Sequence, residues 1–221
     1  MPPRSALAPT RGAATLLYAE SGCTSDDGDR EQARRDMYGL INKAVEGLVR
    51  QRFGDALWHR IRSGANLPDE PFLSMEQYPD ATTYALVSSA TKELGVSSED
   101  ILKEFGRFWM TYTAELGYGE LLRSSGRTLP EFLRNLDALH TRVQMAMNHL
   151  RPPSFAVTDE TADSLVLHYY SGRAGLAPLV IGILEALEAR FDVSIDIRHA
   201  RAGEPREHDV FHLKWRSRAA V

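Results

Sequence analysis

The fold and the most distinctive polar group of this chain both depend on residues 164–173, which have the sequence SLVLHYYSGR. The first seven of these residues are rich in Leu, Val and Tyr, which favour an extended strand. The strand leads into a Tyr-x-Ser-x-Arg run formed by Tyr169, Ser171 and Arg173. If the extended geometry persists, these three side chains point to one side and bring together two hydroxyls and a guanidinium. That group suits a pair of carboxylates or a phosphate, although a polar strand end is the simpler explanation of the run alone.

The residues on both sides of this strand predict an α+β protein. Residues 176–191 predict a mostly apolar helix, and residues 193–197 and 211–215 alternate as strands do, with a hairpin loop expected at residues 203–205. Helical spacing dominates from residue 37 to about residue 150, with helices expected at residues 84–94 and 130–150. We therefore expect an N-terminal helical subdomain followed by a C-terminal subdomain with an antiparallel sheet and helices.

A few residues are expected to divide the helical half. An apolar face continues past Gly54 as far as Ile61. Ser97 or Ser98 has the position of a helix N-cap, because two acidic residues and then an apolar stripe follow. The sequence Gly117-Tyr118-Gly119 is expected to break that helix.

His140 lies in the apolar stripe of the helix predicted at residues 130–150. It comes four residues after Leu136 and three before Val143, so the three side chains share one face. The helix is expected to end at Arg151-Pro152-Pro153, because proline cannot continue it. Taken alone, His140 is most simply a core histidine bonded to a backbone carbonyl. The alternative is a metal ligand, since neutral imidazole binds iron and one histidine commonly holds haem iron.

Composition excludes several classes of protein. The 221 residues carry a net charge of −4, so nucleic-acid binding has no electrostatic support. The single cysteine, Cys23, cannot form an internal disulfide and fits a cytoplasmic location. No apolar run approaches the roughly 20 residues that span a bilayer. The chain has no nucleophile elbow and no zinc or nucleotide motif, so we expect no enzyme activity.

Residues 1–36 differ in character from the rest of the chain. They are rich in Pro, Gly, Ser and charge without periodicity, which predicts a disordered tail. Their apolar piece, residues 13–19, is at the short edge for a signal peptide. A third interpretation is that Met37 is the true start and the tail is mis-annotated.

Several segments resemble the H-NOX family of haem nitric oxide/oxygen-binding domains. They are residues 37–44 (MYGLINKA), 108–113 (FWMTYT), 117–122 (GYGELL), 136–140 (LDALH), 151–153 (RPP) and the run at residues 169–173. The resemblance extends from residue 37 to about residue 215. It is closest to stand-alone bacterial members and similar to the sensor domain of soluble guanylate cyclase. It implies one domain over residues 37–216, with a distal helical part at 37–100, a proximal part at 101–221, and haem b between them.

The same resemblance implies a role for each candidate site residue. His140 matches the iron ligand on the proximal side of the haem, and Pro153 matches a proline that packs on the porphyrin. The group that would bind the haem propionates consists of Tyr169, Ser171 and Arg173. The pocket on the opposite, distal side would be lined by Ile41, Trp109 and Leu179.

The resemblance also implies a gas sensor selective for NO and CO. Oxygen-binding members have a tyrosine donor at the position of Leu179, and a leucine withholds that hydrogen bond of about 1–3 kcal/mol. NO binding would weaken the bond between iron and His140 and free the helix that carries it. The expected partner is a separate histidine kinase or cyclic-di-GMP enzyme. The alternative is a haem carrier, or another ligand-binding protein on the same fold, without NO signalling.

Overall fold

Three helices and a small sheet form the N-terminal part of the computed structural model, which describes residues 36–147, 149–203 and 207–218. The helices are α2 (Gly39–Phe53), α3 (Asp55–Gly64) and α4 (Asp80–Leu94). Strands β1 (Asp36–Tyr38) and β2 (Gln77–Pro79) pair antiparallel and place the start of α2 beside the start of α4. Helix α4 therefore begins four residues before the predicted position, directly after Pro79.

Gly54 separates α2 from α3, and the apolar face predicted to continue past it belongs to two helices. Its φ of 82° is in a region that other residues rarely adopt, so the chain turns there. Trp58 and Ile61 of α3 are fully buried against Leu48 of α2 and Leu86 of α4. The turn thus lets both helices bury their apolar faces in one core.

Helix α5 (Ser98–Thr113) starts as predicted, because the Ser97 hydroxyl accepts a hydrogen bond from the Asp100 amide at 3.1 Å. The predicted break is at Gly117, whose φ is 97°. The chain passes through a π-helical segment, η1 (Ala114–Tyr118), and then enters α6 (Gly119–Ser124).

The single helix predicted at residues 130–150 is wrong, because the structure has two shorter helices there. They are α7 (Leu129–Arg134) and α8 (Leu136–Ala146). Asn135 between them leaves helical geometry, with φ −92° and ψ 5°, and its side-chain amide donates to the Ser125 carbonyl at 2.9 Å. This local hydrogen bond is an alternative to continuing the helix.

A four-stranded antiparallel sheet forms the C-terminal part, in the order β3-β4-β6-β5. The strands are β3 (Ser154–Thr158), β4 (Ser164–Tyr170), β5 (Val193–Ala202) and β6 (His208–Ser217). One face of the sheet buries Leu165, Leu167 and Phe211 in a core with α9 (Ala177–Phe191). Most of the predicted hairpin loop at residues 203–205, and all but the last residue of the predicted tail at residues 1–36, lie outside the described residues.

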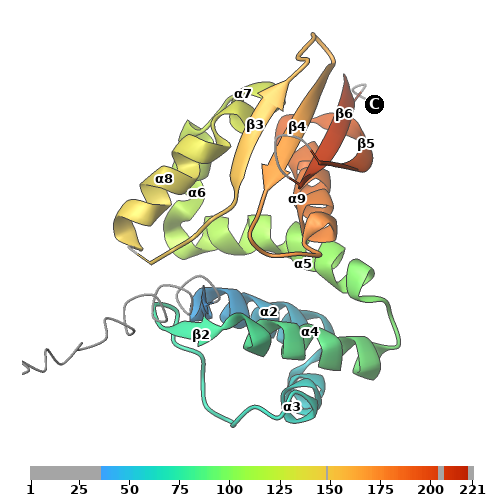
Figure 1. The fold of residues 1–221 in the computed structure, drawn as a ribbon. Helices are drawn as coiled ribbons and strands as arrows, with labels where there is room; N and C mark the ends of the chain where they lie inside the picture. The colour runs from blue at the N-terminus through green and yellow to red at the C-terminus, as the bar shows by residue number, and fades with distance from the viewer. Residues whose placement is uncertain (1–35, 148, 204–206, 219–221) are drawn as a thin grey trace, which may run out of the picture.

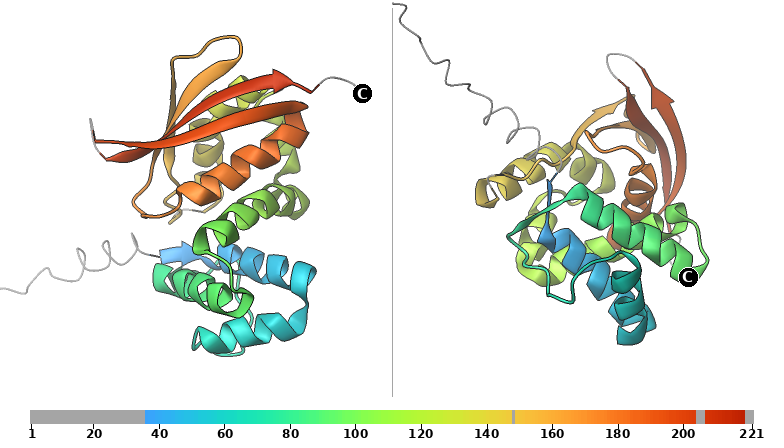
Figure 2. Two further views of the ribbon diagram at one scale, coloured as in Figure 1. Left: turned by 90° about the vertical axis from the view of Figure 1, so that its right-hand side faces the viewer. Right: turned by 60° about the horizontal axis from the view of Figure 1, so that its bottom comes forward.

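Helix α5 lies between the two parts, with α9 and the sheet on one side and α2 and α4 on the other (Figures 1 and 2). Gly106 of α5 and Gly182 of α9 let these helices approach backbone to backbone. A Cβ on Gly106 would lie 2.2 Å from the Leu179 carbonyl oxygen, and one on Gly182 would lie 2.0 Å from that of Lys103. Because of this approach, the first turn of α9 faces the middle of α5.

The observed architecture agrees with the predicted α+β fold. One hydrophobic core fills the α2, α3 and α4 part, and a second core lies between the sheet, α7 and α9. Among the described residues, no helix has both the length and the apolar character needed to cross a bilayer.

Candidate functional site

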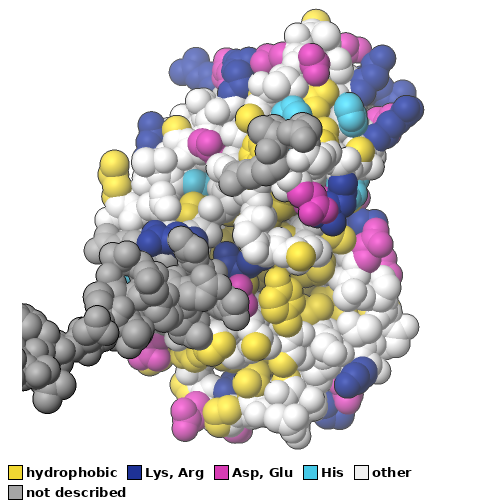
Figure 3. All heavy atoms as spheres, viewed as in Figure 1, with side chains coloured by type: hydrophobic (Ala, Val, Ile, Leu, Met, Phe, Trp, Pro, Cys, Tyr) yellow, Lys and Arg dark blue, Asp and Glu magenta, His cyan; other side chains and the backbone are white. Residues whose placement is uncertain are grey.

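A cavity of about 650 Å³ lies between the two cores. Its walls come from α2, α4, α5, α8 and α9 and from the segments before β3 and after β4. Apolar side chains gather in the hollow between the two parts (Figure 3). The candidate residues from the sequence all line this one cavity: Ile41, Trp109, His140, Pro153, Tyr169, Ser171, Arg173 and Leu179.

One hydrogen bond fixes the protonation pattern of the His140 ring. The ring Nδ1 lies 3.2 Å from the Pro153 carbonyl oxygen. A carbonyl can only accept, so Nδ1 carries the hydrogen and the neutral ring keeps its lone pair on Nε2. Burial lowers the pKa of His140, although the Pro153 carbonyl and Asp137 act in the opposite direction. The arrangement gives a neutral imidazole with a nitrogen available to a metal.

Tyr169 is 3% exposed, and its ring packs on Phe155 at 5.4 Å between centroids. Phe155 also packs on His140 at 5.6 Å, so one aromatic ring supports both candidate residues. Burial raises the pKa of Tyr169, which keeps its hydroxyl protonated and able to donate.

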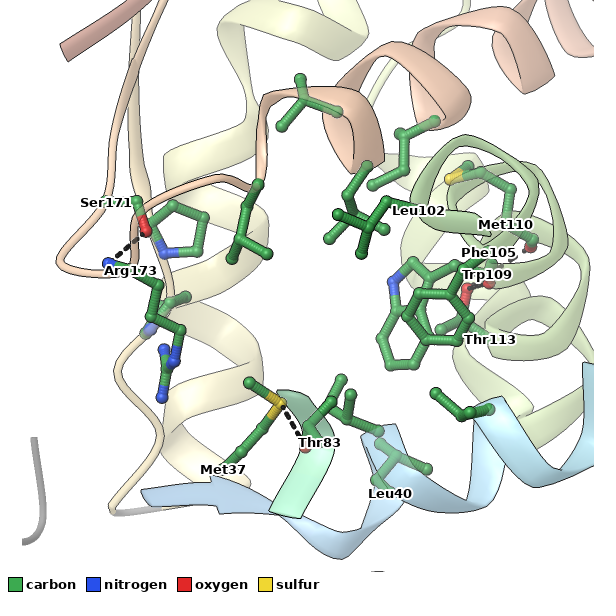
Figure 4. A pocket seen from close by; sticks show the side chains of 18 of the residues that line it. Met37, Leu40, Thr83, Leu102, Phe105, Trp109, Met110, Thr113, Ser171 and Arg173 are labelled. Carbon is green, nitrogen blue, oxygen red and sulfur yellow. Dashed lines mark hydrogen bonds between the residues drawn. The ribbon is translucent and has the colours of Figure 1, made fainter. Parts of the chain in front are cut away.

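Ser171 and Arg173 reach the cavity from a turn, because β4 ends at Tyr170. Extended geometry therefore does not persist to residue 173, and the strand ends where its run of β-forming residues ends. The Ser171 hydroxyl accepts a hydrogen bond from the Arg173 amide at 3.0 Å, and this bond closes the turn. Figure 4 shows both side chains on one side of the cavity, opposite Trp109 and Phe105.

Asp80 belongs to this group and was not found from the sequence. Its Oδ2 accepts from Arg173 Nε at 2.8 Å, and the two side chains are only 15% and 17% exposed. Arg173 Nη1 also donates to the Arg151 carbonyl at 3.3 Å. An aspartate in the first turn of a helix normally indicates only a favourable charge at that end. Nothing local to Asp80 reveals a partner 93 residues away in the chain.

The opposite wall is formed by Ile41 of α2, Trp109 of α5 and Leu179 of α9. Two hydroxyls that line the cavity near them donate to protein acceptors: Thr113 to the Trp109 carbonyl at 2.7 Å, and Thr83 to Asn42 Oδ1 at 2.6 Å. The Trp109 indole carries an N–H, and its ring faces the cavity (Figure 4). Ile41 and Leu179 have no polar atom to donate.

A comparison with protein families identifies the chain. The model of the haem-NO-binding family matches residues 38–199. The chain belongs to this family, known as H-NOX. Its members bind haem, and this chain is therefore an H-NOX haem-binding sensor domain.

Relatives of this H-NOX chain include guanylate cyclases. Soluble guanylate cyclase gcy-34 from Caenorhabditis elegans is 33% identical over 193 residues, which are 80% of this chain and 28% of the cyclase. Guanylate cyclase soluble subunit beta-2 from Rattus norvegicus is 39% identical over 121 residues, which are 51% of this chain and 18% of that subunit. The chain thus spans about a quarter of the length of the first relatives it matches.

Solved H-NOX structures share the fold. An H-NOX protein from S. oneidensis in the Fe(II)NO ligation state superposes with a TM-score of 0.73 and 19% identity, over 82% of this chain and 100% of that one. The Fe(II) unliganded H-NOX protein from K. algicida also gives 0.73, with 22% identity, over 84% of this chain and 100% of that one.

The residues of the cavity fit a haem. The volume is in the range of about 300–1,000 Å³ typical of ligand pockets. His140 offers a neutral nitrogen for the iron, and Arg173 with two hydroxyls offers donors for carboxylates. In the described part of the chain, no three His, Cys, Asp or Glu side chains are grouped to hold a bare metal ion.

Proposed function

We propose that this protein is a haem-based sensor that binds NO and CO, excludes O2 and signals to a separate partner. The proposal rests on the hydrogen bond from His140 Nδ1 to the Pro153 carbonyl, because His140 lines the cavity. The lone pair of the neutral ring is then on Nε2, which would be available to the iron of haem b.

The remaining candidate residues position the haem. Arg173, Ser171 and Tyr169 would hold the propionates by charge-assisted hydrogen bonds, while Pro153 would pack against the porphyrin. When bound, ferrous haem supplies the site to which NO and CO attach. Asp80 orients the Arg173 guanidinium through their ion pair, and it competes with a propionate for the same group.

Selectivity follows from the side chains opposite His140. A distal hydrogen-bond donor stabilises bound O2 by about 1–3 kcal/mol, whereas NO binds ferrous haem tightly without one. Leu179 and Ile41 donate no hydrogen bond. Among these three residues only Trp109 has a side-chain N–H, and tryptophan also occurs at this position in the NO-selective members that the chain resembles.

His140 is the residue through which the signal leaves the site. Two hydrogen bonds join α8 to the segment that leads into β3. One runs from His140 to the Pro153 carbonyl, and in the other Asp137 Oδ1 accepts from the Phe155 amide at 2.6 Å. A haem iron held by His140 would couple the gas ligand to α8 and to these two hydrogen bonds, so α8 would be the ligand-biased two-state element. The outer face of α8 includes Met145, which is 77% exposed and accessible to a partner. The partner class is a histidine kinase or cyclic-di-GMP enzyme in the cytoplasm, and the domain itself is not catalytic.

The test uses the purified chain reconstituted with haem. We expect a five-coordinate ferrous spectrum that is unchanged in air and shifts with NO and CO. We also expect NO to change the activity of a kinase or cyclic-di-GMP enzyme that is mixed with the haem-loaded chain. His140→Gly should abolish the histidine-ligated spectrum, and added imidazole should restore it. A His140→Gly protein with the native spectrum would refute the ligand assignment. Haem binding without any NO-dependent effect on a partner would favour the haem carrier.

A further inference from the structure

His168 and His208 form a hydrogen-bonded pair on the face of the sheet opposite the cavity. His168 Nδ1 lies 2.9 Å from His208 Nε2, and the ring centroids are 5.2 Å apart. His168 is half-buried in β4, and His208, the first residue of β6, is 4% exposed. Tyr169 follows His168 in β4 and therefore points to the other face, where it lines the cavity.

The number of protons on the two rings determines whether the hydrogen bond between His168 and His208 can form. Two neutral rings share one hydrogen, because one nitrogen donates and the other accepts. One additional proton leaves the bridging hydrogen in place. A second additional proton puts N–H groups on both facing nitrogens and two positive charges in contact, so the hydrogen bond is lost. The pair is therefore stable with at most one extra proton.

The surroundings of the pair make it sensitive to acid. From β3, the Thr158 hydroxyl bonds to His168 Nε2 at 2.9 Å, and Asp159 follows it. From β6, His212 adds a third imidazole on the same face, and Arg198 of β5 lies opposite it in the register. Ala202 of β5 faces His208, and Glu207 is paired with Arg201. Residues 204–206 lie outside the described residues.

The direction of the effect follows from these groups. Burial lowers the pKa of His168, and His208 and His212 lower it further, while Asp159 opposes them. A histidine whose pKa falls on folding stabilises the fold above its ordinary pKa, which is about 6.5. That contribution is lost as the pH falls through the lowered value.

Tyr170 connects the pair to the cavity. Its ring stacks on His208 at 4.4 Å with an interplanar angle of 25°, and on His168 at 6.4 Å with an angle of 13°. Tyr170 is also the last residue of β4, between Tyr169 and Ser171. The final β4–β6 partners are Tyr169 and Asp209. Separation of the two imidazoles would therefore disturb the stack beside the end of the β4–β6 pairing, directly behind the Tyr169, Ser171 and Arg173 side chains.

We propose that His168 and His208 form a proton-sensitive contact that holds the turn of residues 169–173 in place at neutral pH and releases it in acid, so that haem retention depends on pH. The inference rests on the proposed function, because this turn is the one that would hold the haem propionates. It assigns to the pair a positioning role, since neither imidazole lines the cavity.

The first test is an NMR titration of the haem-free native chain from pH 8 to pH 5. We expect the hydrogen bond between His168 and His208 to be lost as the pH falls, and the amide signals of residues 169–173 to shift together with that loss. A hydrogen bond that persists to pH 5, or amide signals that do not follow its loss, would overturn the proposal. This measurement needs neither haem nor a variant, so it remains decisive if the proposed function fails.

The second test measures the rate at which the haem-loaded chain loses haem to an excess of an apo-globin. His208→Gln can still accept a hydrogen bond from His168 but cannot be protonated. At pH 7.5 we expect equal rates for the native chain and H208Q. At pH 5.5 we expect the native chain to lose haem about tenfold faster than H208Q, which corresponds to the loss of one hydrogen bond of about 1.4 kcal/mol. His59→Gln, which alters an exposed histidine of α3, should behave like the native chain.

If the rate of haem loss depended on pH in the same way for the native chain and H208Q, the proposal would be overturned. A failure of the native chain to bind haem at pH 7.5 would instead contradict the proposed function, and the NMR titration would then decide about the histidine pair alone. Protonation of His140 in acid should accelerate haem loss equally in all three proteins. A difference in rate between the proteins therefore reports the effect of the His168–His208 pair alone.

Discussion

At the scale of the residue, the chemistry of this H-NOX site depends on which atoms can donate a hydrogen. The Pro153 carbonyl determines the tautomer of His140, because a carbonyl accepts only. The nearby Thr113 and Thr83 hydroxyls donate to protein oxygens. If the proposed function holds, selection among gases would depend on the side chains of the opposite wall, and Leu179 is the residue where a single donor can be added.

Leu179→Tyr should introduce O2 binding, because its phenol can donate to bound O2. One added hydrogen bond of about 1.4 kcal/mol corresponds to about a tenfold gain in O2 affinity. The measurement is the visible spectrum of the ferrous protein at increasing O2 pressure. Leu179→Phe is the matched control, since it has nearly the same size without the hydroxyl. O2 binding by L179F as strong as that by L179Y would contradict the hydrogen-bond explanation.

At the scale of the element, the geometry of the distal wall depends on how closely α5 and α9 pack. The contact is direct between backbones at Gly106 and Gly182, and it brings Leu179 to the wall that Trp109 also forms. The break between α7 and α8 is equally important. It makes α8 a separate short helix that carries His140.

Gly182→Ala should destabilise the protein, because its Cβ would meet the Lys103 carbonyl oxygen at 2.0 Å. Overpacking of this kind typically costs about 1–3 kcal/mol. The free energy of unfolding, measured by urea titration, should fall accordingly. Gly47→Ala in α2 is the control, since its Cβ would make only ordinary contact with Phe108 at 3.5 Å. Both changes gain the same helix propensity, so equal stability of G182A and G47A would refute the close-packing argument.

At the scale of the whole molecule, the cavity is a gap between two separate cores. Each core is centred in its own part, α5 packs against both, and Leu179 of α9 also packs against the N-terminal core. The Arg173–Asp80 ion pair joins the parts at the edge of the cavity, since Asp80 begins α4 and Arg173 follows β4. A bound haem would add contacts to both parts, so its binding should stabilise the molecule by mass action.

Asp80→Asn should weaken the connection between the parts in the haem-free protein. Loss of a charged hydrogen-bond partner for Arg173 should lower the free energy of unfolding by about 1.5–3 kcal/mol. The loss should be smaller with haem bound, because a propionate then partners Arg173. Asp55→Asn is the control: Asp55 also begins a helix and pairs with an arginine, but it is 69% exposed, and such pairs contribute less than about 1 kcal/mol. An equal effect of D80N with and without haem would contradict competition for Arg173.

Much of the fold could be predicted because the relevant signals are local. Helical periodicity, the Ser97 cap, the break at Gly117 and the β-forming residues of β4 are properties of neighbouring residues. The split at Asn135 could not be predicted, since it depends on a hydrogen bond that competes with regular structure.

The candidate site shows the same division. The sequence by itself determined the residue types, namely one histidine in an apolar stripe and a Tyr-x-Ser-x-Arg run, and these residues line one cavity together. Only the tertiary structure decided the tautomer of His140, the Asp80 partner of Arg173 and the pairing of His168 with His208. Those contacts join residues 13, 93 and 40 positions apart, and their energies depend on burial and distance, which folding alone creates.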